Sequence, residues 1–132
     1  MGAGPPRLRV LVVENEPLLR HAAEEMLLEL GHEIVGSASR ARTAIADVDR
    51  MRPDVVLMDI QLDGSRDGVD TAREIRDRFG IASVFVTGAM DEATCQRAHA
   101  ARPLGYLRKP LQLPALQAAL APLSIRATSK LS

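Results

Sequence analysis

Four apolar residues that end in an aspartate, Val55-Val56-Leu57-Met58-Asp59, constrain this chain more than any other stretch. A short apolar run bounded by polar residues is typical of a parallel strand that is covered on both faces of its sheet. In an open α/β sheet, ligands bind outside the carboxyl ends of the strands. We therefore expect Asp59 at the functional edge of such a sheet, close to the ends of the other strands.

Apolar runs of strand length alternate with helical repeats along the rest of the chain. Pro17 favours a helix start, Gly80 favours a helix end, and Pro122 is expected to end the last helix. Five such repeats predict a doubly wound α/β fold, in which a right-handed parallel sheet carries helices on both faces. The expected strands span residues 8–13, 33–37, 54–58, 83–86 and 104–107.

The chain is expected to hold one folded domain. Residues 1–7 are rich in glycine and proline and predict a flexible lead-in, residues 8–123 form the domain, and residues 124–132 form a tail. No apolar run approaches the ~20 residues that a membrane-spanning helix needs. Cys95 is the only cysteine, which excludes an intrachain disulfide and fits a reducing compartment. We therefore expect a cytoplasmic protein.

Overall charge gives no reason to expect nucleic-acid or membrane binding. Lys plus Arg and Asp plus Glu number 17 each, so the formal net charge is zero. Three arginines near the last two helices are expected to form a solvated face, namely Arg97, Arg102 and Arg108. The histidines lack metal-ligand spacing and are expected on the surface, at His21, His32 and His99.

Polar side chains stand at the carboxyl ends of four predicted strands, namely Glu14 with Asn15, Asp59, Thr87 and Lys109. Mg²⁺ prefers oxygen ligands and is usually held by one or two carboxylates while it keeps several waters. A lysine adds a compact positive charge, and a threonine adds a hydroxyl donor. Together these groups suit phosphoryl transfer, with Asp59 as the nucleophile.

At these positions the sequence resembles the receiver domains of bacterial two-component response regulators. The likeness runs from about residue 8 to residue 123 and implies a flavodoxin-like fold with the strand order 2-1-3-4-5. The motifs that carry it are Val12-Val13-Glu14-Asn15-Glu16-Pro17, Leu57-Met58-Asp59-Ile60, Phe85-Val86-Thr87-Gly88 and Tyr106-Leu107-Arg108-Lys109-Pro110.

The resemblance implies that Asp59 accepts a phosphoryl group from a phosphohistidine on a histidine kinase or a histidine phosphotransfer protein. Thr87 and Lys109 would contact the phosphoryl oxygens, and the bond from Lys109 to the following proline would be cis. Tyr106 would change rotamer with Thr87, and the helix–strand–helix face over residues 92–120 would switch its binding to a downstream protein. Such a module is expected to be a single-domain signalling protein and not an enzyme.

The resemblance also implies a metal site, and here the sequence departs from the family. Mg²⁺ would be held by Glu14, Asn15, Asp59 and the backbone carbonyl of Gln61. Asn15 stands where the family usually has aspartate, so we expect weakened Mg²⁺ binding. The loop after Asp59 is one residue longer than the common pattern and carries Asp63, which is expected to make local turn hydrogen bonds more readily than to bind the cation.

Two other functions are compatible with these residues. Asn15 favours a receiver-like module that binds protein partners without being phosphorylated. A flavodoxin-like protein that binds a nucleotide or flavin, or a small phosphatase, is the third alternative. No glycine-rich phosphate loop follows the first strand, and Glu14 and Glu16 would repel a phosphate there, so the third alternative is disfavoured.

Overall fold

The computed structural model describes residues 7–62, 67–88 and 91–131, and their side chains as far as residue 123. The described strands form one parallel sheet in the order β2-β1-β3-β4-β5, so the predicted fold class and strand order are confirmed. The strands are β1 (Arg9–Val13), β2 (Glu33–Ala38), β3 (Val55–Asp59), β4 (Ser83–Thr87) and β5 (Gly105–Arg108). The helices are α1 (Pro17–Glu29), α2 (Ala41–Met51), α3 (Gly68–Phe79), α4 (Glu92–Ala100) and α5 (Leu113–Leu131).

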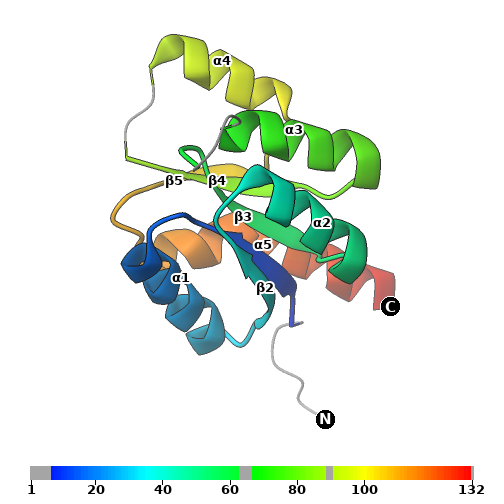
Figure 1. Ribbon diagram of the computed structural model, residues 1–132. Coiled ribbons are helices and arrows are strands. Elements are labelled where there is room, and N and C mark those ends of the chain that lie inside the picture. The colour runs from blue at the N-terminus through cyan, green and yellow to red at the C-terminus, as the bar shows by residue number, and fades with distance from the viewer. Residues whose placement is uncertain (1–6, 63–66, 89–90, 132) are drawn as a thin grey trace.

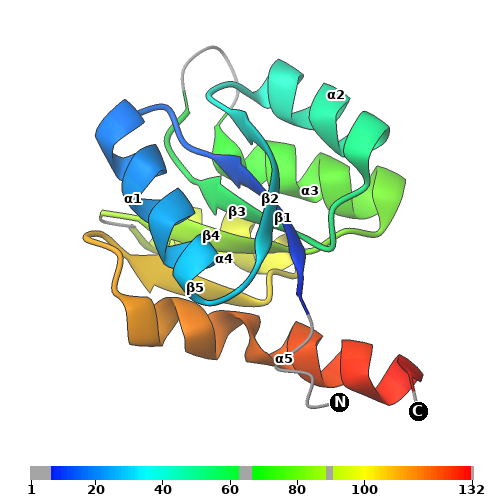
Figure 2. The same cartoon turned by 90° about the horizontal axis from the view of Figure 1, so that it is seen from below.

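Helices cover both faces of the sheet, as Figures 1 and 2 show from two sides. On one face, Leu27 of α1 and Leu116 of α5 belong to an apolar cluster with the side chains of β1, β3 and β4. On the other face, the cluster includes Val48 of α2, Ile75 of α3 and Ala98 of α4. Because both faces are covered, the central strands read as continuous apolar runs in the sequence.

The middle strand, β3, pairs with β1 and β4, and all five of its residues are buried. An aspartate stands at each end of its apolar part. Asp54 precedes the strand and is exposed, and its Oδ2 accepts a hydrogen bond from the Arg9 N–H at 2.7 Å. Asp59 ends the strand at the opposite edge of the sheet and is 2% exposed.

Most helix ends follow the local sequence signals. Pro17 is the first residue of α1, and Gly80, at φ 70°, ends α3 in the left-handed conformation that suits glycine. The prediction that Pro122 ends the last helix is wrong, because α5 continues through Pro122 to Leu131. Pro122 lacks the N–H that would donate to the carbonyl of Ala118, so the helix continues at the cost of one hydrogen bond. No helix in the described part of the chain is long and apolar enough to cross a membrane.

The histidines divide into two kinds. His21 and His99 are exposed, as predicted. His32 is not on the surface; it is 8% exposed, and its Nδ1 accepts a hydrogen bond from the Leu8 N–H at 3.1 Å. Burial lowers the pKa of His32, because desolvation disfavours the imidazolium. His32 therefore ties the start of the first strand to the turn before the second.

Candidate functional site

The carboxyl ends of β1, β3 and β5 bring three charged side chains together. Lys109 Nζ lies 3.3 Å from Asp59 Oδ1 and 3.4 Å from Glu14 Oε1. The two carboxylates are 2% and 6% exposed, respectively. These groups are far apart in sequence and meet because parallel strands end at the same edge of the sheet. One ammonium therefore stands between two buried carboxylates.

The two oxygens of Asp59 have different surroundings. Oδ1 accepts the Gln61 N–H at 3.0 Å and also contacts the Lys109 ammonium. Oδ2 is buried and has no hydrogen-bond partner among the residues that the structure describes. A buried carboxylate oxygen without a partner is costly, which makes this atom the natural contact for a bound cation or an incoming electrophile.

Glu14 is held by the backbone of the turn that follows β1. Its Oε2 accepts the Glu16 N–H at 3.0 Å, and Arg20 Nη1 of α1 donates to the Glu14 carbonyl at 3.0 Å. Burial raises the pKa of Glu14, and the nearby Asp59 carboxylate raises it further, whereas the Glu16 N–H and the Lys109 ammonium lower it. Arg20 was not identified from the sequence, because an arginine in the first turn of a helix carries no distinctive signal.

Thr87 and Tyr106 lie on the two strands beyond Asp59. Thr87 ends β4, is 7% exposed, and accepts the Lys109 N–H at its backbone carbonyl at 2.9 Å. Tyr106 of β5 is 43% exposed, and its ring centroid lies 5.9 Å from that of Phe85. The bond between Lys109 and Pro110 is cis, as the family resemblance implied.

The side chains at this edge offer the oxygen ligands that a hard cation prefers. Glu14 follows β1 and is followed by Asn15 in place of a second acid, so the set has one carboxylate fewer. Glu14, Asn15, Asp59 and the Gln61 carbonyl offer oxygen atoms, and the unpartnered Asp59 Oδ2 is the atom that a cation would satisfy. No group of three or more His, Cys, Asp or Glu side chains within the described residues is placed to hold a metal. Asp63 lies outside the described residues.

The site is backed by apolar side chains. A cavity of about 100 Å³ lies between α1 and the segment after β5, and its lining includes Leu19, Leu57 and Leu111 together with Asp59 and Lys109. An apolar lining excludes water from one side of the charged groups, and a lower local dielectric strengthens the attraction between them.

The arginines near the last two helices are exposed, as predicted, but two of them are paired. Arg97 Nη2 lies 2.9 Å from Asp67 Oδ2, and Arg102 Nη2 lies 3.6 Å from Asp77 Oδ1. Arg108 is exposed on β5. Carboxylates therefore offset much of this positive charge, which supports a solvated face.

Comparisons with known proteins agree with the fold and the motifs. The family model described as the response regulator receiver domain matches residues 10–121. A transcriptional regulatory protein of Mycobacterium tuberculosis, PdtaR, is 38% identical over 111 residues, which cover 84% of this chain and 53% of that protein. The chemotaxis protein CheY of Thermotoga maritima is 30% identical over 105 residues, which cover 79% of this chain and 87% of that protein.

Solved structures show the same likeness. The receiver domain of a modulated diguanylate cyclase from Desulfovibrio desulfuricans matches with a TM-score of 0.86 at 30% identity, covering 96% of this chain and all of that one. Among the first curated relatives that match, the chain spans about half the length of PdtaR and less of two others. The matched region covers most of the chain and contains all four strand-end motifs, and the chain belongs to the family of response regulator receiver domains.

Proposed function

We propose that Asp59 accepts a phosphoryl group from a phosphohistidine on a histidine kinase or a histidine phosphotransfer protein. An oxygen of the Asp59 carboxylate forms a bond to phosphorus while the bond from phosphorus to the histidine nitrogen breaks, and the nitrogen keeps the electron pair. The observation that carries this proposal is the convergence of Glu14 and Lys109 on Asp59, whose Oδ2 has no partner among the described residues. The protein would act as a cytoplasmic signalling module.

Each neighbour of Asp59 has a role in this reaction. The Lys109 ammonium already lies 3.3 Å from Asp59 and can turn to an oxygen of the incoming phosphoryl group. The Thr87 hydroxyl can donate to a second phosphoryl oxygen. Mg²⁺ would be held by Glu14, Asn15, Asp59 and the Gln61 carbonyl, and it would supply positive charge opposite the phosphoryl oxygens.

Phosphorylation would change the surface formed by α4, β5 and α5. Thr87 would move toward the phosphoryl group, and Tyr106, which is 43% exposed beside Phe85, would follow it inward. Such a shift favours one of two pre-existing arrangements of the surface. A downstream protein would bind one arrangement better than the other.

Acetyl phosphate with Mg²⁺, followed by intact-mass measurement, tests the proposal. We expect wild-type protein to gain one phosphoryl group and Asp59→Asn to gain none. Asp54→Asn is the matched control, because Asp54 stands at the opposite end of the same strand and its asparagine can still accept the Arg9 N–H. Loss of uptake in Asp54→Asn, or equal uptake in Asp59→Asn and wild type, would contradict the assignment.

A second function is favoured by one specific feature. Asn15 removes a negative charge from the expected metal site, and Lys109 already neutralises one of the two remaining carboxylates. The alternative is a protein-binding receiver whose arrangement does not depend on phosphorylation. In that case, the affinity for a partner would be the same for wild type, for Asp59→Asn and for protein stripped of metal.

A further inference from the structure

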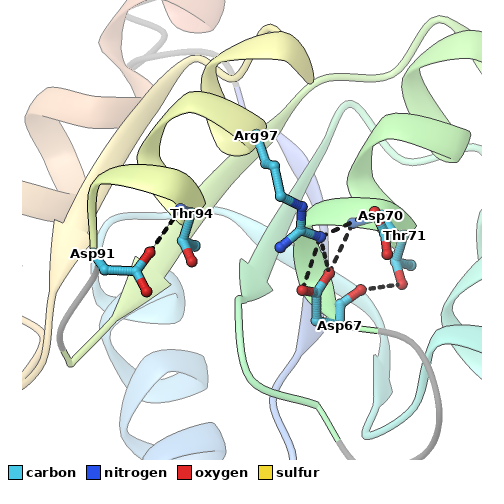
Figure 3. A network of polar contacts seen from close by, with 6 residues as sticks. All are labelled: Asp67, Asp70, Thr71, Asp91, Thr94 and Arg97. Atoms are coloured by element: carbon cyan, nitrogen blue, oxygen red, sulfur yellow. Dashed lines mark hydrogen bonds and ion pairs between the residues drawn. The ribbon is translucent and has the colours of Figure 1, made fainter.

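A polar network joins α4 to the start of α3, and Figure 3 shows it at close range. Arg97 Nη2 lies 3.1 Å and 2.9 Å from the two carboxylate oxygens of Asp67 and 3.0 Å from Asp70 Oδ1. The Arg97 side chain is 44% exposed, so solvent screens these contacts and each contributes modestly. One guanidinium nitrogen from α4 therefore bridges two carboxylates at the first turn of α3.

Asp67 also organises the residues that lie next to Asp59. Its Oδ1 accepts the Asp70 N–H at 3.0 Å, which caps α3. The next residue, Gly68, donates its N–H to the Ile60 carbonyl at 2.7 Å, and a Cβ on Gly68 would stand 1.9 Å from the Asp59 carbonyl oxygen. Arg97 therefore holds the carboxylate of Asp67, and the backbone of the next residue, Gly68, lies against the backbone of Asp59.

Among the described residues, α4 has few other anchors: Arg102, just after the helix, lies 3.6 Å from Asp77 of α3, and both side chains are more than half exposed. The only buried residue of α4 is Ala98, whereas α3 buries five residues, including Val69 and Ile75. An alanine side chain contributes little apolar area, so packing alone holds α4 weakly. Asp91 accepts the Thr94 N–H at 2.7 Å, but this contact lies within the first turn of α4 and does not position the helix against its neighbours (Figure 3).

We propose that Arg97 is a latch that holds α4 against the start of α3 in the unphosphorylated protein and so sets how readily the α4 surface switches. This inference rests on the proposed function, in which phosphorylation of Asp59 shifts that surface. Coupling between two sites is reciprocal, so a contact that favours the resting arrangement also opposes phosphorylation. Opening the latch should therefore favour the phosphorylated form.

Arg97→Gln removes the latch charge, and Arg73→Gln is its matched control. Arg73 lines the same groove between α3 and α4 and loses the same charge without removing a contact to Asp67. Without any phosphoryl donor, we expect the amides of α4 to exchange hydrogen about fivefold faster in Arg97→Gln, since partly exposed ion pairs contribute modestly. Arg73→Gln should match wild type, and Arg97→Lys should lie between, because an ammonium restores the charge without the planar fork.

The second readout is the acetyl phosphate concentration that gives half-maximal phosphorylation. We expect this concentration to fall about fivefold in Arg97→Gln, because loss of the Arg97 contacts shifts the equilibrium between the two arrangements by about the same factor. General destabilisation would not make phosphorylation easier, so this direction separates a latch from a merely structural contact. Asp67→Asn keeps the helix cap, and combining it with Arg97→Gln should add little to either change alone.

Two results would overturn the latch. One is equal α4 exchange in wild type, Arg97→Gln and Arg73→Gln. The other is an unchanged or raised half-maximal acetyl phosphate concentration in Arg97→Gln when wild type is phosphorylated. A wild-type protein that takes up no phosphoryl group would instead refute the proposed function, and the exchange measurement would then decide alone whether Arg97 holds α4.

Discussion

A single methyl group added at Gly68 should displace the backbone of Asp59. Gly68 begins α3, and its N–H donates to the Ile60 carbonyl at 2.7 Å. A Cβ added at Gly68 would lie 1.9 Å from the Asp59 carbonyl oxygen and 2.9 Å from the Ile60 Cα. Gly68 is not among the glycines with positive φ, so the expected cost of Gly68→Ala is steric. The new methyl group would meet the backbone of the proposed phosphoryl acceptor.

The size of the effect follows from this geometry. Ordinary van der Waals contact requires the two backbones to separate by about 1.5 Å, which a rotamer change cannot provide. Overpacking of this kind costs about 1–3 kcal/mol, and weakening the Gly68 hydrogen bond costs about 1 kcal/mol more. The lower chain entropy of alanine in the unfolded state offsets about 0.5–1 kcal/mol. The net loss should be about 1–3.5 kcal/mol.

Equilibrium unfolding in urea measures this loss, and thermal unfolding should show a fall in Tm of about 10 °C. Gly88→Ala is the control, because a Cβ at Gly88 meets nothing within 4 Å at the end of the neighbouring strand. Phosphorylation of Gly68→Ala by acetyl phosphate should also slow, since the displaced segment carries Asp59. Gly68→Ala with the same stability as Gly88→Ala would refute the reasoning.

Three further outcomes are expected. Asn15→Asp should tighten Mg²⁺ binding by about tenfold or more, because it adds a negative charge beside the cation, and calorimetry showing unchanged affinity would contradict this. His32 has a lowered pKa in the folded protein, so the unfolded chain binds the proton first and the free energy of unfolding should fall as the pH drops below 6.5. Urea unfolding at several pH values should show His32→Gln without this dependence and exposed His21→Gln with it. Pro122→Ala should raise stability by about 1–3 kcal/mol in thermal unfolding, because it restores a donor to Ala118 within α5; an unchanged Tm would argue against it.

The sheet and the meeting of Glu14, Asp59 and Lys109 at its edge were predictable, because both follow from where the apolar runs end in the sequence. The apolar run before Asp59 defines a strand covered on both faces, and parallel strands must end at one edge. Glu14 and Lys109 were therefore expected beside Asp59, and Lys109 Nζ lies within 3.4 Å of both carboxylates. Neither of these two contacts needed knowledge of how the helices pack.

Features that depend on tertiary packing were not predictable. His32 looked like a surface histidine, and its burial against Leu8 arises only when the first and second strands pair. Pro122 was expected to end a helix, yet the rest of α5 outweighs one missing hydrogen bond. The contact from Arg97 to Asp67 joins residues 30 positions apart, and no local pattern marks such a pair.

The two aspartates at the ends of the apolar run in β3 have a consequence for how the chain assembles. Asp54 and Asp59 stand at opposite ends of four apolar residues, and both faces of this strand are buried, so a slip of even one residue would place a carboxylate where an apolar side chain packs. Such a slip in either direction would draw one carboxylate into the apolar layers between the sheet and its helices, at a cost of several kcal/mol. The strand therefore has a single admissible alignment with its neighbours, and that alignment delivers Asp59 to the rim each time the protein folds.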